Sequence, residues 1–104
     1  MSEFCNVTVV KKANTYFGGS VTSRTVRFQD GSQKTLGIMM PGEYEFNTAD
    51  KELMEILAGE AQVLLPEDDS WSVFREGDVF EVRADSSFKI RTQDILDYCC
   101  SYLT

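Results

Sequence analysis

Hydrophobic residues recur along the chain in short runs, and each run is followed by a turn signal. The runs that predict strands are residues 20–28, 35–40, 61–65, 71–74, 79–82, 88–91 and 98–103. The turn signals include Asp30-Gly31, Pro41-Gly42 and Glu76-Gly77-Asp78, which favour tight reversals of the backbone. Turn signals at intervals of about 8–12 residues are typical of an all-β sandwich or barrel.

One segment, residues 50–58, carries a different pattern. It is rich in helix-forming residues, its apolar side chains recur at helical spacing, and Thr48 stands where a helix cap would. The same residues also fit a strand over 53–57 that turns at Ala58-Gly59-Glu60 into the strand at 61–65. The local pattern leaves both interpretations open.

Composition narrows the class of protein. The 104 residues suffice for one domain with a single core. Seventeen acidic residues against ten basic ones give a formal charge of −7, which disfavours nonspecific binding to nucleic acid and docking on anionic membranes. No apolar run reaches the roughly 20 residues of a membrane helix, and the N-terminal residues lack a signal-peptide pattern. We therefore expect a cytoplasmic protein with no nucleic-acid or membrane partner.

Histidine and cysteine usage limits metal and redox chemistry. The chain has no histidine, which is the commonest metal ligand. Its three cysteines, Cys5, Cys99 and Cys100, are odd in number and suggest no disulfide framework. On a strand, the vicinal pair would point to opposite faces. We expect three reduced cysteines and no catalytic transition metal.

Two stretches resemble the two sequence motifs of cupins. In the first, residues 41–48 precede Glu52, which is separated from Gly59 by six residues, as the motif glutamate is from its glycine. In the second, Gly77 begins the motif, Arg83 stands in the place of the motif proline, and Phe88 stands in the place of its histidine. The order of the two motifs makes the resemblance more specific than either motif alone.

A closer resemblance is to the small bacterial pyrimidine/purine nucleoside phosphorylases, which are cupins without metal-binding histidines. The segments that carry it lie at residues 14–17, 35–39, 41–46, 64–66, 71 and 98–102. The resemblance spans residues 14–103 and implies an all-β, single-domain cupin over 14–104, preceded by an N-terminal arm, 1–13. It also implies a strand at 53–57 and phosphate-dependent cleavage of nucleosides to a free base and a pentose 1-phosphate.

Strand alternation then predicts which side chains face the interior of the cup, because every second residue of a strand shares a face. The candidates for substrate binding are Tyr44, Phe46, Thr48, Met54 and Phe88. Aromatic side chains at these positions offer stacking surfaces to a nucleobase, and stacking tolerates different bases. The structural alternative is that these residues only fill the hydrophobic core of a small barrel.

Glu52 is the candidate catalytic residue, since the same alternation turns it toward the cup. Cleavage of a glycosidic bond passes through an oxocarbenium-like state, and carboxylates flank that charge in most glycoside-cleaving sites. A carboxylate here could also bind the ribose hydroxyls. A glutamate at the rim, with a salt-bridge partner, is the structural alternative.

Phosphate binding by so acidic a chain requires local cations or backbone N–H groups. Six basic residues are candidates, of which we favour Arg83, Arg24 and Arg91 over Arg27, Lys34 and Lys89. Inorganic phosphate is then a co-substrate, and we expect no cofactor.

Two other functions compete with an enzyme acting on nucleosides and phosphate. One is a non-catalytic cupin that binds a small aromatic ligand, and the other is an interaction protein that uses acidic strand faces. In either case we expect a homodimer, since small cupins commonly pair through strand edges.

Overall fold

The computed structural model describes residues 3–103, which form eleven β-strands and one short 3₁₀ turn, η1 (Phe17–Gly19). The strands are β1 (Thr8–Val9), β2 (Asn14–Tyr16), β3 (Val21–Arg27), β4 (Gln33–Met39), β5 (Gly42–Thr48), β6 (Lys51–Ala58), β7 (Glu60–Leu64), β8 (Ser72–Arg75), β9 (Val79–Val82), β10 (Ser86–Thr92) and β11 (Leu96–Leu103). Each apolar run that predicted a strand coincides with one of them. The all-β prediction is confirmed.

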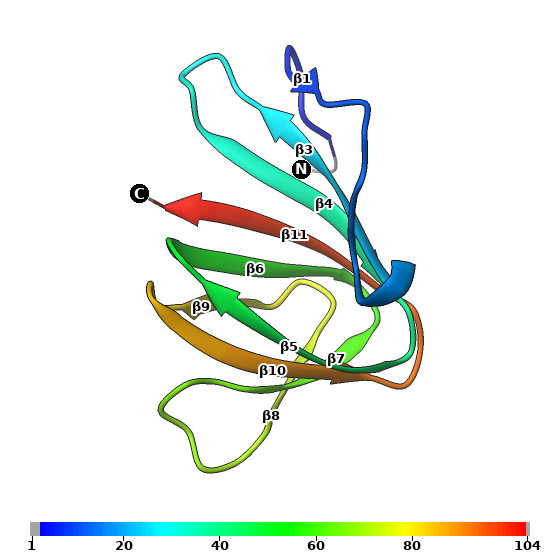
Figure 1. Ribbon diagram of the computed structural model, residues 1–104, viewed down its shortest axis with the longest axis vertical. Coiled ribbons are helices and arrows are strands. Elements are labelled where there is room, and N and C mark those ends of the chain that lie inside the picture. The colour runs from blue at the N-terminus through cyan, green and yellow to red at the C-terminus, as the bar shows by residue number, and fades with distance from the viewer. Residues whose placement is uncertain (1–2, 104) are drawn as a thin grey trace.

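The strands pair into two antiparallel sheets that face each other (Figure 1). The larger sheet has the order β1-β3-β4-β11-β6-β9, and β2 also pairs with β3. The smaller sheet has the order β5-β10-β7-β8. Neighbouring strands in each sheet are often distant in the sequence, and the C-terminal strand β11 pairs with β4 from the first half of the chain.

The ambiguous segment is strand β6, so the helix interpretation of residues 50–58 is wrong. β6 pairs with β11 along one edge and with β9 along the other, which satisfies its backbone groups. Met54 and Ile56 are buried from this strand, while Glu55 and Leu57 between and after them are exposed. Helix propensity differs between residues by less than about 1 kcal/mol, and two ladders with burial outweigh it. The strand ends at Gly59, whose φ of +98° suits the predicted turn.

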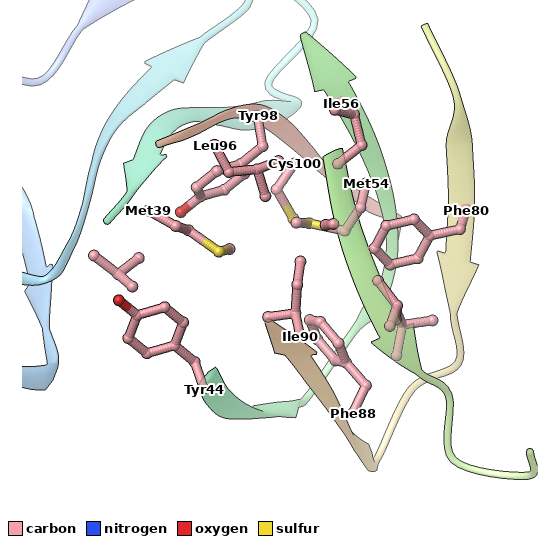
Figure 2. Close-up of a cluster of buried hydrophobic side chains, with 14 residues drawn as sticks. Met39, Tyr44, Met54, Ile56, Phe80, Phe88, Ile90, Leu96, Tyr98 and Cys100 are labelled. Atoms are coloured by element: carbon pink, nitrogen blue, oxygen red, sulfur yellow. The ribbon is translucent and has the colours of Figure 1, made fainter. Parts of the chain in front are cut away.

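The core lies between the two sheets. Ile56 and Leu96 from the larger sheet and Ile90 from the smaller one are fully shielded from solvent. Figure 2 shows side chains of both sheets converging, with Phe88 and Ile90 on β10 facing Met54 and Cys100. Burial of such side chains is the main force that holds a small all-β domain together.

The described part of the N-terminal arm extends the larger sheet at its edge. β1 pairs with the end of β3, and the amide of Val10 donates to the carbonyl of Thr25 at 2.9 Å. The ring of Phe4 packs edge-on against Phe28, with 5.1 Å between ring centroids. The arm therefore covers the outer side of β3.

Within residues 3–103, no helix is long and apolar enough to cross a membrane.

Gly37 on β4 leaves room for an aromatic ring from the neighbouring strand. It pairs with Tyr98 of β11 on one side and with Ser23 of β3 on the other. A Cβ atom added at Gly37 would lie 2.6 Å from Cζ of Tyr98 and 2.6 Å from the carbonyl oxygen of Thr22. Both distances are too short for a real Cβ atom. The Thr22 carbonyl cannot easily move away, because it belongs to a strand that is paired with β4. The ring of Tyr98 therefore requires glycine at this position.

We predict that Gly37→Ala lowers the free energy of unfolding by about 1–3 kcal/mol, the usual cost of overpacking. Urea unfolding monitored by circular dichroism measures the change. Leu36→Ala, at an exposed position on the same strand, should cost clearly less. A Gly37→Ala protein as stable as the parent would show that the Tyr98 ring does not depend on glycine.

Candidate active site

A cavity of about 240 Å³ opens between the two sheets. Its apolar wall consists of Met39, Phe46, Met54 and Phe88. Its polar wall on the larger sheet consists of Ser23, Thr35, Glu52, Tyr98, Cys100 and Tyr102, and Asn47 of β5 adds a polar group from the smaller sheet. The cavity thus has one side suited to a flat apolar group and one suited to hydroxyl groups.

The apolar side carries a cluster of aromatic rings. Phe46 and Phe88 pair across β5 and β10, and their rings stack with 5.7 Å between centroids and an interplanar angle of 26°. Tyr16 and Phe17 cover Phe46 edge-on, at 6.0 Å and 5.4 Å. Phe17 adopts a φ of +52°, a region disfavoured for side chains other than glycine, which suggests that its contacts hold it there. Phe46 is only partly buried and remains accessible in the cavity.

Glu52 is the one acidic side chain among the described residues that line this cavity. It is partly buried, and its Oε1 accepts a hydrogen bond from the Cys100 thiol at 3.4 Å. Burial raises the pKa of the Glu52 carboxyl above its ordinary value, the Cys100 hydrogen bond opposes this rise, and the charge of Asp50 adds to it. Glu52 is therefore a carboxylate in a partly dry environment, where its charge acts strongly on nearby groups.

The neighbours of Glu52 on β11 are neutral hydrogen-bond donors. Burial raises the pKa of Tyr98, Cys100 and Tyr102 well above their ordinary values, so all three keep their protons at neutral pH. The hydroxyls of Tyr102 and Thr35 lie 3.2 Å apart. The polar wall therefore presents protonated hydroxyl and thiol groups beside one carboxylate.

The structure brings four of the sequence-predicted residues together in the cavity: Phe46, Glu52, Met54 and Phe88. Tyr44 and Thr48 share their face of β5 but do not line it. The Tyr44 hydroxyl donates to the carbonyl of Met40 at 2.7 Å. The Thr48 hydroxyl donates to the carbonyl of Arg83 at 2.7 Å and accepts from the amide of Ser86 at 3.1 Å. Both residues are buried, and their polar atoms satisfy the backbone.

The three arginines predicted to bind phosphate lie outside the cavity. Arg83 forms a salt bridge with Glu67 at 2.6 Å. Arg24 donates to the carbonyl of Lys11. Arg91 lies 3.9 Å from the ring centroid of Trp71 and donates to Gln62 at 2.5 Å. Within residues 3–103 no arginine or lysine lines the cavity, so the structure does not bring these three together with Glu52.

Sequence reasoning missed the polar wall of the cavity, above all Tyr98 and Tyr102. Alternation along β11 carries Tyr98, Cys100 and Tyr102 to one face, and this signal was available in the sequence. Cys99 faces the other side, where it pairs with Leu36, so the prediction of opposite faces for the vicinal cysteines is confirmed. All three cysteines are free.

Metal ligation finds little support among the described residues. No group of three or more cysteine, aspartate or glutamate side chains within residues 3–103 is arranged to hold a metal ion. The absence of a cofactor remains a prediction.

Comparison with known proteins gives the family. Residues 11–102 match the sequence model of the family described as "Pyrimidine/purine nucleoside phosphorylase". The chain belongs to this family. It is 60% identical over 103 residues to the pyrimidine/purine nucleoside phosphorylase of Syntrophotalea carbinolica, covering 99% of both chains. It is 57% identical over 103 residues to that of Leptospira interrogans, covering 99% of this chain and 97% of the other.

Solved structures of related proteins have the same architecture. A protein of unknown function from Acinetobacter sp. ADP1 superposes with a TM-score of 0.96 and 43% identity, over 99% of this chain and 100% of that one. A cupin superfamily protein from Desulfitobacterium hafniense superposes with a TM-score of 0.67 and 22% identity, over 88% of this chain and 82% of that one. The second likeness shows the fold alone, and it confirms the predicted cupin fold.

The Thr48 hydroxyl bonds to backbone groups and does not line the cavity. We predict that Thr48→Val, which keeps the shape and removes the hydroxyl, lowers the free energy of unfolding by about 1–3 kcal/mol, because the Ser86 amide loses its hydroxyl acceptor and the Arg83 carbonyl keeps only the Ser86 hydroxyl as a side-chain donor. Thr48→Ser retains the hydroxyl and should cost less. Urea unfolding of both variants decides the point, and equal stability of Thr48→Val and the parent would contradict it.

Proposed function

We propose that the chain catalyses the phosphorolysis of nucleosides in the cavity between the sheets, releasing a free base and a pentose 1-phosphate. Membership of the phosphorylase family supports the activity. The observation that carries the assignment to this cavity is the presence of a partly buried carboxylate, Glu52, in the same cavity as the stacked rings of Phe46 and Phe88.

The base binds at the apolar side of the cavity. The partly buried ring of Phe46 forms an apolar surface of the cavity together with Met54 and Phe88. Stacking on aromatic rings contributes about 1–3 kcal/mol per base and does not depend on which base is stacked. Such contacts suit an enzyme that accepts both purines and pyrimidines.

Glu52 acts on the pentose. As the bond between the anomeric carbon and the base nitrogen breaks, its electron pair leaves with the base, which takes up a proton, and positive charge develops on the pentose. The Glu52 carboxylate stabilises that charge, and a phosphate oxygen forms the new bond to the anomeric carbon. Because Cys100 donates to Oε1, the second oxygen of the carboxylate is free to face the substrate.

The remaining polar groups orient the pentose. Tyr98, Tyr102 and Thr35 present neutral hydroxyls on the same wall as Glu52. Neutral donors and acceptors can hydrogen-bond to ribose hydroxyls without neutralising the carboxylate. These residues therefore position the substrate, while Glu52 lowers the activation barrier for cleavage of the glycosidic bond.

We further propose a cytoplasmic homodimer that needs no metal or organic cofactor and uses inorganic phosphate as its co-substrate. The three free cysteines support a reducing compartment. Ile38 and Val79 on the larger sheet are exposed apolar side chains, which supports contact with a second copy. Sedimentation velocity of the purified protein tests the dimer, and a monomer at micromolar concentration would refute it.

The activity is tested by the release of free base from uridine and adenosine with and without inorganic phosphate. Release only in the presence of phosphate identifies a phosphorylase. Release without phosphate would indicate a hydrolase. Thermal stabilisation by a nucleoside with no release would select the non-catalytic binding protein, an alternative that the family match disfavours.

We predict that Glu52→Gln lowers kcat for uridine by about tenfold to a thousandfold, equivalent to about 1.4–4 kcal/mol, with a smaller effect on KM. The charge acts mainly in the oxocarbenium-like transition state, whereas an amide retains much of the ground-state hydrogen bonding. Glu55→Gln is the matched control, since Glu55 lies on the exposed face of the same strand. Unchanged turnover by a folded Glu52→Gln protein would remove Glu52 from the mechanism.

The pH dependence of kcat should report the ionisation of Glu52. The ionised form is the active one, so kcat falls as the pH drops through the pKa of Glu52, which burial has raised. The Cys100 hydrogen bond lowers that pKa, and Cys100→Ala should therefore move the acid limb of the profile to higher pH. An acid limb that stays in place in Cys100→Ala would show that the thiol does not tune the carboxyl.

A further inference from the structure

The cavity continues outward into a second, polar compartment. This outer compartment has a volume of about 490 Å³ and shares Tyr16, Thr35 and Tyr102 with the inner cavity. Its other walls include Gln33 at the start of β4 and Asp50 before β6. The two compartments are therefore adjacent, and together they are named the cleft, with its apolar wall in the inner part and its polar part toward solvent.

Strand alternation directs one arginine to the face that lines this cleft. On β3, Ser23 lines the inner cavity and Thr25 lines the outer compartment. The next residue on the same face is Arg27, which pairs with Gln33 on the neighbouring strand β4. Arg24 lies on the opposite face of β3, toward the N-terminal arm, where it donates to the carbonyl of Lys11.

Arg27 is also the arginine whose guanidinium is not already bound to another residue within residues 3–103. Arg75 and Arg83 form salt bridges with Glu60 and Glu67, and Arg24 and Arg91 have the contacts described above. Within residues 3–103, the guanidinium of Arg27 has no salt-bridge or hydrogen-bond partner, and the residue is exposed. An unpaired guanidinium can form the bidentate contacts that phosphate oxygens favour.

The register places Arg27 at the same end of the larger sheet as Glu52. Along the outermost row of the larger sheet, Arg27 pairs with Gln33, and Tyr102 pairs with Glu52. β3, β4, β11 and β6 are consecutive neighbours, so three spacings of about 4.8 Å separate the backbones of Arg27 and Glu52, roughly 14 Å in all. An extended arginine side chain covers roughly half of this span, which leaves room for a phosphate ion beside the pentose.

Electrostatics favour the same position. The charged side chains that line the two compartments are Glu52 and Asp50, both acidic, as far as residues 3–103 show. A phosphate ion in the cleft therefore meets repulsion unless a cation approaches from the rim. We propose that Arg27 forms a phosphate-binding subsite at the outer compartment, with the hydroxyl of Thr25 as a neutral donor. This subsite rests on the proposed function, because its ligand is the co-substrate of that reaction.

The test is the KM for phosphate at saturating uridine. Arg27→Met should raise it by about tenfold to a hundredfold, the usual cost of losing a charged hydrogen bond, and should change the KM for uridine much less. Arg27→Lys, which keeps the charge and loses the fork, should give an intermediate value. Arg75→Met is the matched control, since Arg75 lies on β8, away from the cleft, and it should leave both KM values unchanged.

An unchanged KM for phosphate in a folded Arg27→Met protein would overturn the proposal. So would a large rise in Arg24→Met, Arg83→Met or Arg91→Met with none in Arg27→Met.

A second measurement separates this inference from the proposed function. Inorganic phosphate alone should raise the Tm of the parent protein and not that of Arg27→Met. If the parent shows no phosphorolysis but phosphate still raises its Tm through Arg27, the activity fails and the subsite stands. If the parent is active and phosphate raises the Tm of both proteins equally, the subsite fails and the activity stands.

Discussion

The pairing of β11 with both β4 and β6 determines what the cavity contains. β11 lies at the centre of the larger sheet, and its register carries Tyr98, Cys100 and Tyr102 inward. A shift of one residue would replace these side chains with those of the intervening positions, Asp97, Cys99 and Ser101. The pairing with β6 is irregular between Asp97 and Tyr98 and regular beyond that point. The polar wall and the placement of Glu52 opposite Tyr102 both follow from this register.

The second constraint is the cost of keeping a carboxylate partly out of water. Glu52 has no cation beside it among the described residues, and a single weak donor, the Cys100 thiol, contacts it. An uncompensated charge of this kind destabilises the folded state. Its retention is understandable if the same charge stabilises a cation that exists only during turnover. A residue that served packing alone would be better replaced by an apolar one.

Much of the architecture could be predicted from the sequence, since alternating apolar runs and turn residues locate the strands. Glu52, Met54 and Phe88 were found because motif spacing and strand alternation act over short distances along the chain. Residues 50–58 resisted local reasoning, because the partners that make them a strand, β11 and β9, are remote in sequence. The phosphate-binding arginines could not be identified from the sequence for a related reason. Whether a basic side chain is free depends on partners such as Glu67 or Trp71, which no local pattern identifies.

The two parts of the cleft differ in their access to solvent, and this difference bears on the order of binding. The inner cavity is lined by Met39, which is almost completely buried and pairs with the buried Val21 and Leu96, whereas the outer compartment is lined by residues 31–33 of an exposed hairpin. If the base stacks on Phe46 and phosphate binds in the outer compartment, as proposed, the base lies farther from solvent than the phosphate. The nucleoside then binds first, and the base leaves last, after the pentose phosphate. The proposed sites therefore imply a compulsory order of binding and release.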